Sequence, residues 1–182
     1  MAISRGVFLL SDVVIEKLMS SWTGSCDVWI TNYVDVSNFG YFGGGQTVSR
    51  VDRIDYANDT ATAAVKGPLS IARYFLAATG NSNFGYFGGG QIPQTVSTVD
   101  RINYANDTAD ATVKGPLSAA RSYLAATGNS NFGYFGGGNS PTVSTVDRID
   151  YANDTATAVA KGPLSSARRE LAATTGPTVS FV

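Results

Sequence analysis

The sequence predicts an all-β domain built from a tandem repeat, with a short helical arm before it. The segment NFGYFGGG occurs three times, beginning at residues 38, 83 and 131. In each copy VDRI(D/N)YANDTA and then KGPLS follow, and equivalent positions lie 45 to 48 residues apart. A period of that length is typical of stacked or ring-forming units. Within the unit, short extended runs alternate with turn residues and no capped helical period is present, which indicates strands joined in hairpins.

The unit is predicted to hold four short strands. FGYFGG alternates glycine with aromatic residues before a triple-glycine turn, and VDRIDY follows as a second extended run. The sequence AND is a tight-turn signal, because Asn and Asp side chains bond their own backbone. In the first repeat the strands are expected at 39–44, 51–56, 60–65 and 74–79. The three repeats then cover about 38–82, 83–130 and 131–176.

Residues 1–24 differ from the repeats and hold the one good helix candidate. Ser11 is placed to cap this helix, and four apolar residues spaced for one face follow. They are Val14, Ile15, Leu18 and Trp22. We expect this stripe to dock on a partner, since a free chain would have to bury it. The repeat domain then covers 25–182; within it, 27–34 stand where later units carry LAAT, and 177–182 where they carry FGYFGG.

Three motifs of the unit resemble the kelch repeat of β-propeller proteins. They are an aromatic strand running into glycines (Tyr41 to Gly44), a Val-x-x-x-x-Tyr strand (Val51 to Tyr56) and a Pro-Leu-x-x-Ala-Arg segment (Pro68 to Arg73). The likeness covers about residues 25–182 and implies four-stranded blades around a common axis. Small residues such as Thr62 stand where the family has a tryptophan. The segments YFGGG and VDRIDYANDTA are also similar to repetitive proteins of marine bacteriophages.

Hairpin counting predicts three full four-stranded repeats and a partial fourth. LAAT-type and FGYFGG-type strands make one kind of hairpin, of which the chain holds four when both flanks are used. VDRIDY and the strand after it make another kind, of which the chain holds three. Propellers close with about four to eight blades. Either the fourth blade is half built or several chains share the ring. A β-trefoil or β-prism is the alternative, because three pseudo-symmetric units suit three repeats.

Composition excludes several kinds of chemistry. The 182 residues include no histidine and one cysteine. Ser-His-Asp and Cys-His catalytic pairs, imidazole metal ligands and an intramolecular disulfide are therefore excluded. Kelch-type oxidases bind copper through histidine, so their activity is not expected here. With 13 basic and 14 acidic residues the net charge is −1, which leaves no electrostatic footprint for nucleic acid. We expect no enzyme activity, no metal and no cofactor.

Two sets of residues are candidates for ligand contacts. Packing in a core is the usual use of an aromatic strand, yet tyrosines on such strands can also stack on sugar rings. The tyrosines are Tyr41, Tyr86 and Tyr134. In a sheet with one buried face, only Tyr41 or its neighbour Phe42 would be internal. The spacer after GGG varies in length between repeats, which marks an exposed loop. The spacers begin with Gln46, Gln91 and Asn139.

The other polar positions have structural explanations. The triplet NDT matches the N-glycosylation pattern but is expected to be a hairpin turn. Asp52, Asp55 and Asp59 lack the spacing of a calcium loop, and we expect pairing of Arg53 with a neighbouring carboxylate. Lys66 and its two equivalents in KGPLS are expected to be solvated. Hydrolysis by paired carboxylates is the weakest functional hypothesis for the same reason.

These observations predict a non-enzymatic structural or binding module. The phage-like segments narrow it to a virion accessory protein, in capsid decoration or in the tail or a fibre, anchored on other virion proteins by its arm. The alternatives are a lectin-like protein that binds host surface glycans and an intracellular kelch-type protein-interaction module. Near-identical repeats favour a homo-oligomer or a multicopy protein. The apolar run 6–10 is too short for a signal peptide, and no segment could span a membrane. The phage-like segments lead us to expect a virion location.

Overall fold

The computed structural model describes residues 38–176. The predicted helical arm at 1–24, with its docking residues, lies outside the described residues. So do Cys26 and the two flanking segments that were predicted to complete the outer hairpins. The arm residues concerned are Val14, Ile15, Leu18 and Trp22.

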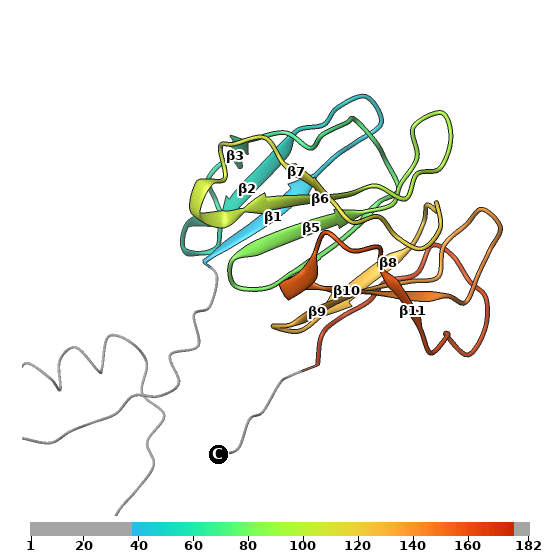
Figure 1. Cartoon of the computed structure of the whole chain (residues 1–182). Helices are drawn as coiled ribbons and strands as arrows, with labels where there is room; N and C mark the ends of the chain where they lie inside the picture. The colour runs from blue at the N-terminus through green and yellow to red at the C-terminus, as the bar shows by residue number, and fades with distance from the viewer. Residues whose placement is uncertain (1–37, 177–182) are drawn as a thin grey trace, which may run out of the picture. The chain divides into compact units, whose positions relative to one another are not determined.

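The described part of the chain is all-β and forms three antiparallel sheets (Figure 1). The first sheet, blue to teal, contains β1 (Phe39–Gly43), β2 (Val51–Asp55) and β3 (Ala64–Lys66). The second, green to yellow, contains β4 (Ala77–Gly80), β5 (Phe84–Gly88), β6 (Val99–Asn103) and β7 (Thr112–Lys114). The third, orange to red, contains β8 (Ala125–Gly128), β9 (Phe132–Gly136), β10 (Val146–Asp150) and β11 (Val159–Lys161). No α-helix occurs between residues 38 and 176.

Each full sheet begins with the LAAT strand of one repeat and continues with three strands of the next repeat. The strand orders are β4-β5-β6-β7 and β11-β10-β9-β8, with neighbours in sequence paired throughout. The first sheet follows the same order but begins at β1. This confirms the predicted hairpins and their sequence. It also shows that a repeat boundary drawn in the sequence does not coincide with a sheet boundary.

The fourth predicted strand begins three residues later than expected, at Ala77 instead of Tyr74. Phe75 has a φ of 58°, and its equivalents Tyr123 and Glu170 each have a φ of 57°. A left-handed residue cannot continue a strand, so the backbone turns here before β4 and β8 begin. The Phe75 and Tyr123 rings stack with centroids 3.8 Å apart, and the Tyr123 N–H donates to the Phe75 carbonyl at 2.9 Å.

A one-turn 3-10 helix follows each VDRI(D/N) strand: η1 (Tyr56–Asn58), η2 (Tyr104–Asn106) and η3 (Tyr151–Asn153). The side chain before each turn caps it, and Asp55 Oδ1 accepts from the Ala57 N–H at 2.9 Å. The capped turn therefore places the aspartate that ends it at the same position relative to each sheet. These aspartates are Asp59, Asp107 and Asp154. The turn predicted for NDT is confirmed.

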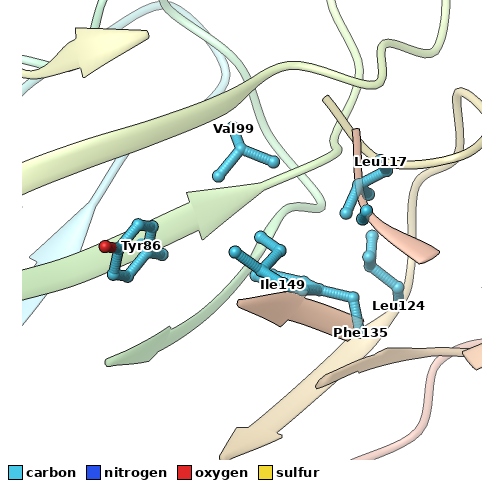
Figure 2. Close-up of a cluster of buried hydrophobic side chains, with 7 residues drawn as sticks. Tyr86, Val99, Leu117, Leu124, Phe135 and Ile149 are labelled. Carbon is cyan, nitrogen blue, oxygen red and sulfur yellow. The ribbon is translucent and has the colours of Figure 1, made fainter. Parts of the chain in front are cut away.

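The middle sheet is buried on both faces. Tyr86 and Phe87, which point to opposite sides of β5, are 0% and 4% exposed. From the sequence, one aromatic set was expected inside for a sheet with a single buried face, and this sheet does not meet that condition because it packs between two neighbours. Figure 2 shows the larger core cluster, in which Tyr86 and Val99 of the second sheet face Phe135 and Ile149 of the third.

Glycines in the aromatic strand admit the ring of the next repeat. A Cβ at Gly43 would lie 2.7 Å from the Phe87 ring, and one at Gly88 would lie 2.6 Å from the Phe135 ring. Any larger residue would push the sheets apart. Among the described residues, no helix is long and apolar enough to cross a membrane, and no group of His, Cys, Asp or Glu could hold a metal ion.

Candidate functional site between neighbouring sheets

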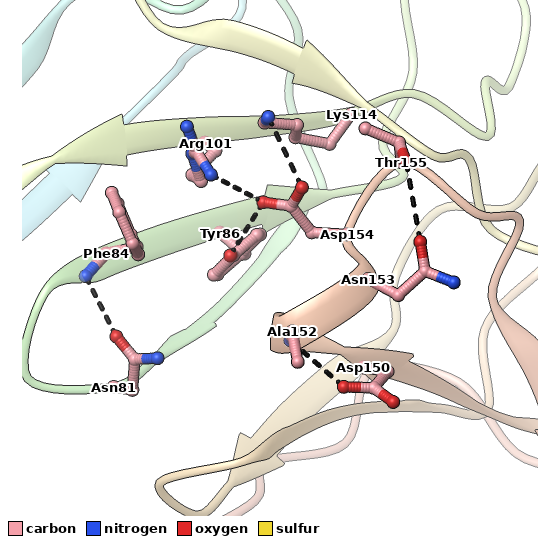
Figure 3. Close-up of polar contacts among 10 residues, drawn as sticks. All are labelled: Asn81, Phe84, Tyr86, Arg101, Lys114, Asp150, Ala152, Asn153, Asp154 and Thr155. Carbon is pink, nitrogen blue, oxygen red and sulfur yellow. Dashed lines mark hydrogen bonds and ion pairs between the residues drawn. The ribbon is translucent and has the colours of Figure 1, made fainter.

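The clearest convergence of charged side chains lies between the second and third sheets, around Asp154. Figure 3 shows this carboxylate, carried by the turn after η3, reaching the sheet of the preceding repeat. Asp154 Oδ2 accepts from Tyr86 Oη at 2.9 Å and from Arg101 Nη1 at 2.8 Å. Lys114 Nζ lies 3.3 Å from Asp154 Oδ1. One buried carboxylate is thus held by a phenol and two cations.

Asp107 makes the same contacts between the first and second sheets. Its Oδ2 accepts from Tyr41 Oη at 3.0 Å and from Arg53 Nη1 at 2.8 Å. Its Oδ1 lies 3.1 Å from Lys66 Nζ. The strand register explains the convergence, since Tyr41 stands opposite Arg53 in the β1–β2 pair. We call this arrangement of one aspartate with a tyrosine, an arginine and a lysine the carboxylate clamp.

The clamp shifts the ionisation of its members. Burial acts to raise the pKa of Asp107, but hydrogen bonds from Lys66 and Tyr41 and attraction to Arg53 outweigh it and lower that pKa below 3.8. Burial and the contact with Asp107 raise the pKa of Tyr41. Burial first, and then neighbouring tyrosines, raise the pKa of Tyr104 to about 12. The contacts around Asp107 therefore favour its charged carboxylate and the neutral phenol of Tyr41.

Backbone hydrogen bonds fix the turn beside each clamp. The Gly115 N–H donates to the Asp154 carbonyl at 2.8 Å, and the Ala158 N–H donates to the Pro116 carbonyl at 2.8 Å. A Cβ on Gly115 would overlap the Ala156 carbonyl, so glycine is required at this approach. Gly67 occupies the equivalent place between the first two sheets. The glycine of KGPLS thus belongs to the contact between sheets.

A second ion pair is fully buried within each four-stranded sheet. Arg73 Nη1 lies 2.7 Å from Asp100 Oδ2, and both side chains are 0% exposed. Arg73 also donates to the carbonyls of Gly89 and Phe87, each at 2.9 Å. Arg121 and Asp147 repeat the pair in the third sheet at 2.9 Å. Through these contacts the buried Arg73 side chain holds the loop before β4 against the strands that follow.

The tyrosines predicted as sugar platforms have a different place in the structure. Tyr41 and Tyr86 donate to clamp aspartates and stack on Tyr104 and Tyr151, with ring centroids 4.8 and 4.7 Å apart. Their faces are covered by the next repeat, so they are not open to a ligand. Tyr134 is half-buried and has no such partner within residues 38–176.

The spacer residues do not converge on one point. Gln46 is exposed, whereas the main chains of Gln91 and Asn139 pair with Tyr74 and Ser122. The second and third spacers nevertheless lie beside each other, because Thr95, directly after spacer 91–94, donates from Oγ1 to Ser140 Oγ of spacer 139–141 at 3.1 Å.

Two sequence-based expectations about charge need correction. Lys66 and Lys114 are 13% and 12% exposed and paired, not solvated, because the aspartate of the following repeat packs over them. Arg53 pairs with Asp107, 54 residues away, and not with a nearby carboxylate. The aspartate of NDT was interpreted only as a turn residue. The sequence did hold one sign of the clamp, because this aspartate, a tyrosine, an arginine and a lysine recur at matching positions in every repeat.

A shallow hollow of about 260 Å³ lies beside β1. It is lined by Tyr41 to Gly44 on one side and by Leu76 to Ala78 at the start of β4 on the other. Asp52 and Phe87 complete the lining. The hollow follows the edge of the first sheet where the other sheets have a fourth strand.

Comparison of the chain with protein-family models finds no match, and comparison with curated proteins finds none. The resemblances to kelch repeats and to phage repeat proteins therefore stay predictions from the motifs.

Replacement of a clamp aspartate should weaken the fold in a pH-dependent way. Asp107→Asn should lower the free energy of unfolding by about 3 kcal/mol, because two buried cations lose their counter-charge. Since the pKa of Asp107 is below 3.8 when folded, its contribution is present above that pH and lost as pH falls through the folded pKa. Urea unfolding between neutral and acid pH measures both effects.

Asp59→Asn is the matched control, because Asp59 occupies the same turn in the first repeat and is exposed, with no side-chain hydrogen bond or ion pair to residues 38–176. In protein dilute enough to be monomeric, it should change the free energy of unfolding by no more than about 0.5 kcal/mol and keep the wild-type pH dependence. Equal effects of the two substitutions would contradict the clamp.

Proposed function

We propose that the chain is a non-enzymatic structural and binding module built on a propeller-like stack of sheets. The observation that carries this proposal is the carboxylate clamp. At the two interfaces between the described sheets, the carboxylates, phenols and cations bond to one another, as Asp154 does with Tyr86 and Arg101. Side chains held in this way stabilise a scaffold and have no free position from which to act on a substrate.

Two features support the propeller-like arrangement over a β-trefoil or β-prism. The middle sheet is buried on both faces, as Tyr86 and Phe87 show, whereas a trefoil or prism leaves one face of each sheet outside. The LAAT strands are also neighbours: β4 contacts β8, and Thr127 of β8 bonds Thr174 and Thr175 of the next LAAT segment. Inner strands that follow one another around an axis are characteristic of propellers.

The narrower role that we propose is a virion accessory protein, in capsid decoration or in the tail. Its support is the likeness of YFGGG and VDRIDYANDTA to phage repeat proteins, together with the apolar stripe predicted for residues 1–24. Purified particles should contain the full chain in many copies, as measured by quantitative mass spectrometry. A chain of residues 25–182 should fold, by circular dichroism, but should not join the particle.

Substitution of serine at all four stripe positions should have the same effect as this deletion. Asp110→Lys, an exposed change in the middle repeat, is the control and should be incorporated like the wild type. A shortened chain that is incorporated normally would contradict the docking arm. The substituted positions are Val14, Ile15, Leu18 and Trp22.

Ligand recognition by the variable spacers is a second candidate, favoured by the contact between Thr95 and Ser140. That contact brings two spacers of different length together at the surface, as in a binding face formed by loops. Host glycans or a protein partner would then be read by 91–94 and 139–141, not by the tyrosines. A glycan array probed with the full chain tests it, and replacement of 91–94 by the single Gln of the first repeat should abolish binding. A blank array would remove the lectin-like form of this proposal.

A further inference from the structure

Each sheet has two different faces, and the repeats use them in one direction. We call the leading face the side with the second phenylalanine of FGYFG and the YANDTA turn. The trailing face is the opposite side. In the first sheet it carries Tyr41 and Gly43 of FGYFG, Arg53 of VDRI, and Lys66 and Gly67 of KGP. In both interfaces described above, a leading face packs on the trailing face of the sheet before it, as Phe87 packs on Gly43 and Phe135 on Gly88.

The leading face of the first sheet is uncovered within the described part of the chain. Phe42 is 63% exposed, whereas its equivalents Phe87 and Phe135 are 4% and 0% exposed. Tyr56 is 58% exposed, although both of its equivalents stack on a tyrosine of the preceding sheet. Asp59, the equivalent of the two clamp aspartates, is exposed and has no cation partner between residues 38 and 176.

The trailing face of the third sheet is uncovered in the complementary way. The nearest atoms to a Cβ built on Gly136 lie 3.6 Å away, and nothing lies within 4 Å of one built on Gly162. Arg148 stacks over the Phe132 ring at 4.3 Å, and neither it nor Lys161 has a carboxylate partner among residues 38–176. This face therefore has the cations and the glycine openings of a clamp without its aspartate.

The strands are complementary as well. Among residues 38–176, β1 has no strand on its outer side, whereas β5 and β9, with the same FGYFG sequence, each pair with a LAAT strand there. The third LAAT segment, 171–175, bonds Thr127 and Gly128 of β8, and residues 177–182 after it read PTVSFV in place of FGYFG. The hollow of about 260 Å³ beside β1 lies where a LAAT strand would complete the first sheet.

We propose that a second copy of this chain occupies these faces, head to tail. The leading face of one copy packs on the trailing face of its partner, with Phe42 over Gly136 and Asp59 between Arg148 and Lys161. Residues 171–175 of the partner add to β1 as its missing neighbour, in the place predicted from the sequence for residues 27–34 of the same chain. The new interface repeats the two internal ones, so its geometry and its charge complementarity are already built into the repeat.

The occupant is a second copy because the sequence needed to fill the site is that of the repeat. YANDTA and KGPLS occur only in the three repeats of this sequence, so neither flank carries either motif. Two copies joined in this way contain six sheets, within the range of about four to eight at which propellers close. Three copies would contain nine. A closed dimer with two heterologous interfaces is therefore the expected assembly.

Asp52 of the first repeat has no part in the proposed interface between copies. Asp52 corresponds to Asp100, which binds Arg73, but in the first repeat Asp52 pairs with Arg50 at 3.1 Å. Arg50 stands where the other repeats have threonine. Because Arg50 already neutralises Asp52, the inference rests on Phe42, Asp59 and the strand edge, and Arg168 has no part in it.

Sedimentation velocity of the purified full chain tests the proposal. The wild type should sediment with twice the chain mass of 19.0 kDa. Asp59→Lys, which blocks the leading face, and Gly136→Leu, which blocks the trailing face, should each raise the dimer dissociation constant about 100-fold. Asp59 is exposed and the nearest atoms to a Cβ on Gly136 lie 3.6 Å away, so the circular dichroism spectrum should stay as in the wild type. The unfolding transition should also be unchanged when it is measured in protein dilute enough to be monomeric. Asp110→Lys, an exposed charge reversal in the middle repeat, should leave the dimer intact.

Mixing the two blocked variants distinguishes a head-to-tail contact from any symmetric one. Asp59→Lys keeps a free trailing face and Gly136→Leu keeps a free leading face, so the mixture should form a dimer through one intact interface. A wild-type chain that stays monomeric, as when its own flanks cover both faces, would overturn the proposal. So would a dimer that neither substitution weakens, or a mixture that stays monomeric. The measurement uses the isolated chain, so its result is independent of the virion role.

Discussion

Arg73→Met should lower the free energy of unfolding by about 3–5 kcal/mol, which is among the largest effects of any single substitution in the repeats. The guanidinium and its partner Asp100 are both 0% exposed, and the substitution leaves that carboxylate buried without a counter-charge. The carbonyls of Gly89 and Phe87 lose their donors as well. Urea or thermal unfolding, monitored by circular dichroism, measures the loss.

Arg168→Met is the matched control for this prediction. Arg168 occupies the same sequence position in the third repeat, but it is exposed and its side chain forms no ion pair within residues 38–176. The change should cost no more than about 0.5 kcal/mol. Adding Asp100→Leu to Arg73→Met should restore part of the stability, because an apolar pair removes the unpaired buried charge. Similar losses for both arginines would mean that the buried ion pair is not responsible.

Gly115→Ala should separate the second and third sheets and lower the free energy of unfolding by about 3 kcal/mol. The new methyl group would overlap the Ala156 carbonyl, and moving it away breaks the hydrogen bond from Gly115 N–H to the Asp154 carbonyl. Because Asp154 is also the clamp aspartate, the displacement weakens three side-chain contacts at once. Equilibrium unfolding at neutral pH measures this effect.

Gly162→Ala provides the comparison. Both glycines precede a proline and follow a lysine, so the substitution has the same local effect on the backbone in both places. Nothing lies within 4 Å of a Cβ at Gly162, and we expect a change within about 0.5 kcal/mol when the protein is diluted. A large loss for this variant too would show that the backbone, and not the contact between sheets, requires glycine.

The local part of the fold could be predicted from the sequence. The order of the strands and the turn at NDT follow from patterns within about ten residues, and the period follows from motifs that recur 45 to 48 residues apart. The structure confirms the strand order and the turn. The start of the fourth strand was wrong because Phe75 adopts a left-handed conformation, which the sequence of an aromatic residue does not signal. The burial of both Tyr86 and Phe87 was missed because it depends on a sheet lying on each side.

The charged contacts could not be assigned from the sequence, although every participant was visible in it. Asp107 meets Tyr41 and Arg53 across 66 and 54 residues, and the same motifs offer a nearer carboxylate in every repeat. Which carboxylate each arginine binds depends on how one sheet packs on the next. Glycines explained by turns alone, such as Gly115, likewise proved to be points of contact between sheets.

By itself, then, the sequence determined the strands, the turns and their threefold recurrence, because hydrogen bonding and side-chain alternation act over short distances along the chain. The tertiary structure decided which carboxylate each cation binds and which faces are left over. The repeats are nearly identical in sequence, so Asp59 and Asp107 differ mainly in whether another sheet packs against the turn that carries them. The position of a sheet in the stack, and not its sequence, makes Phe42 exposed and Phe87 buried.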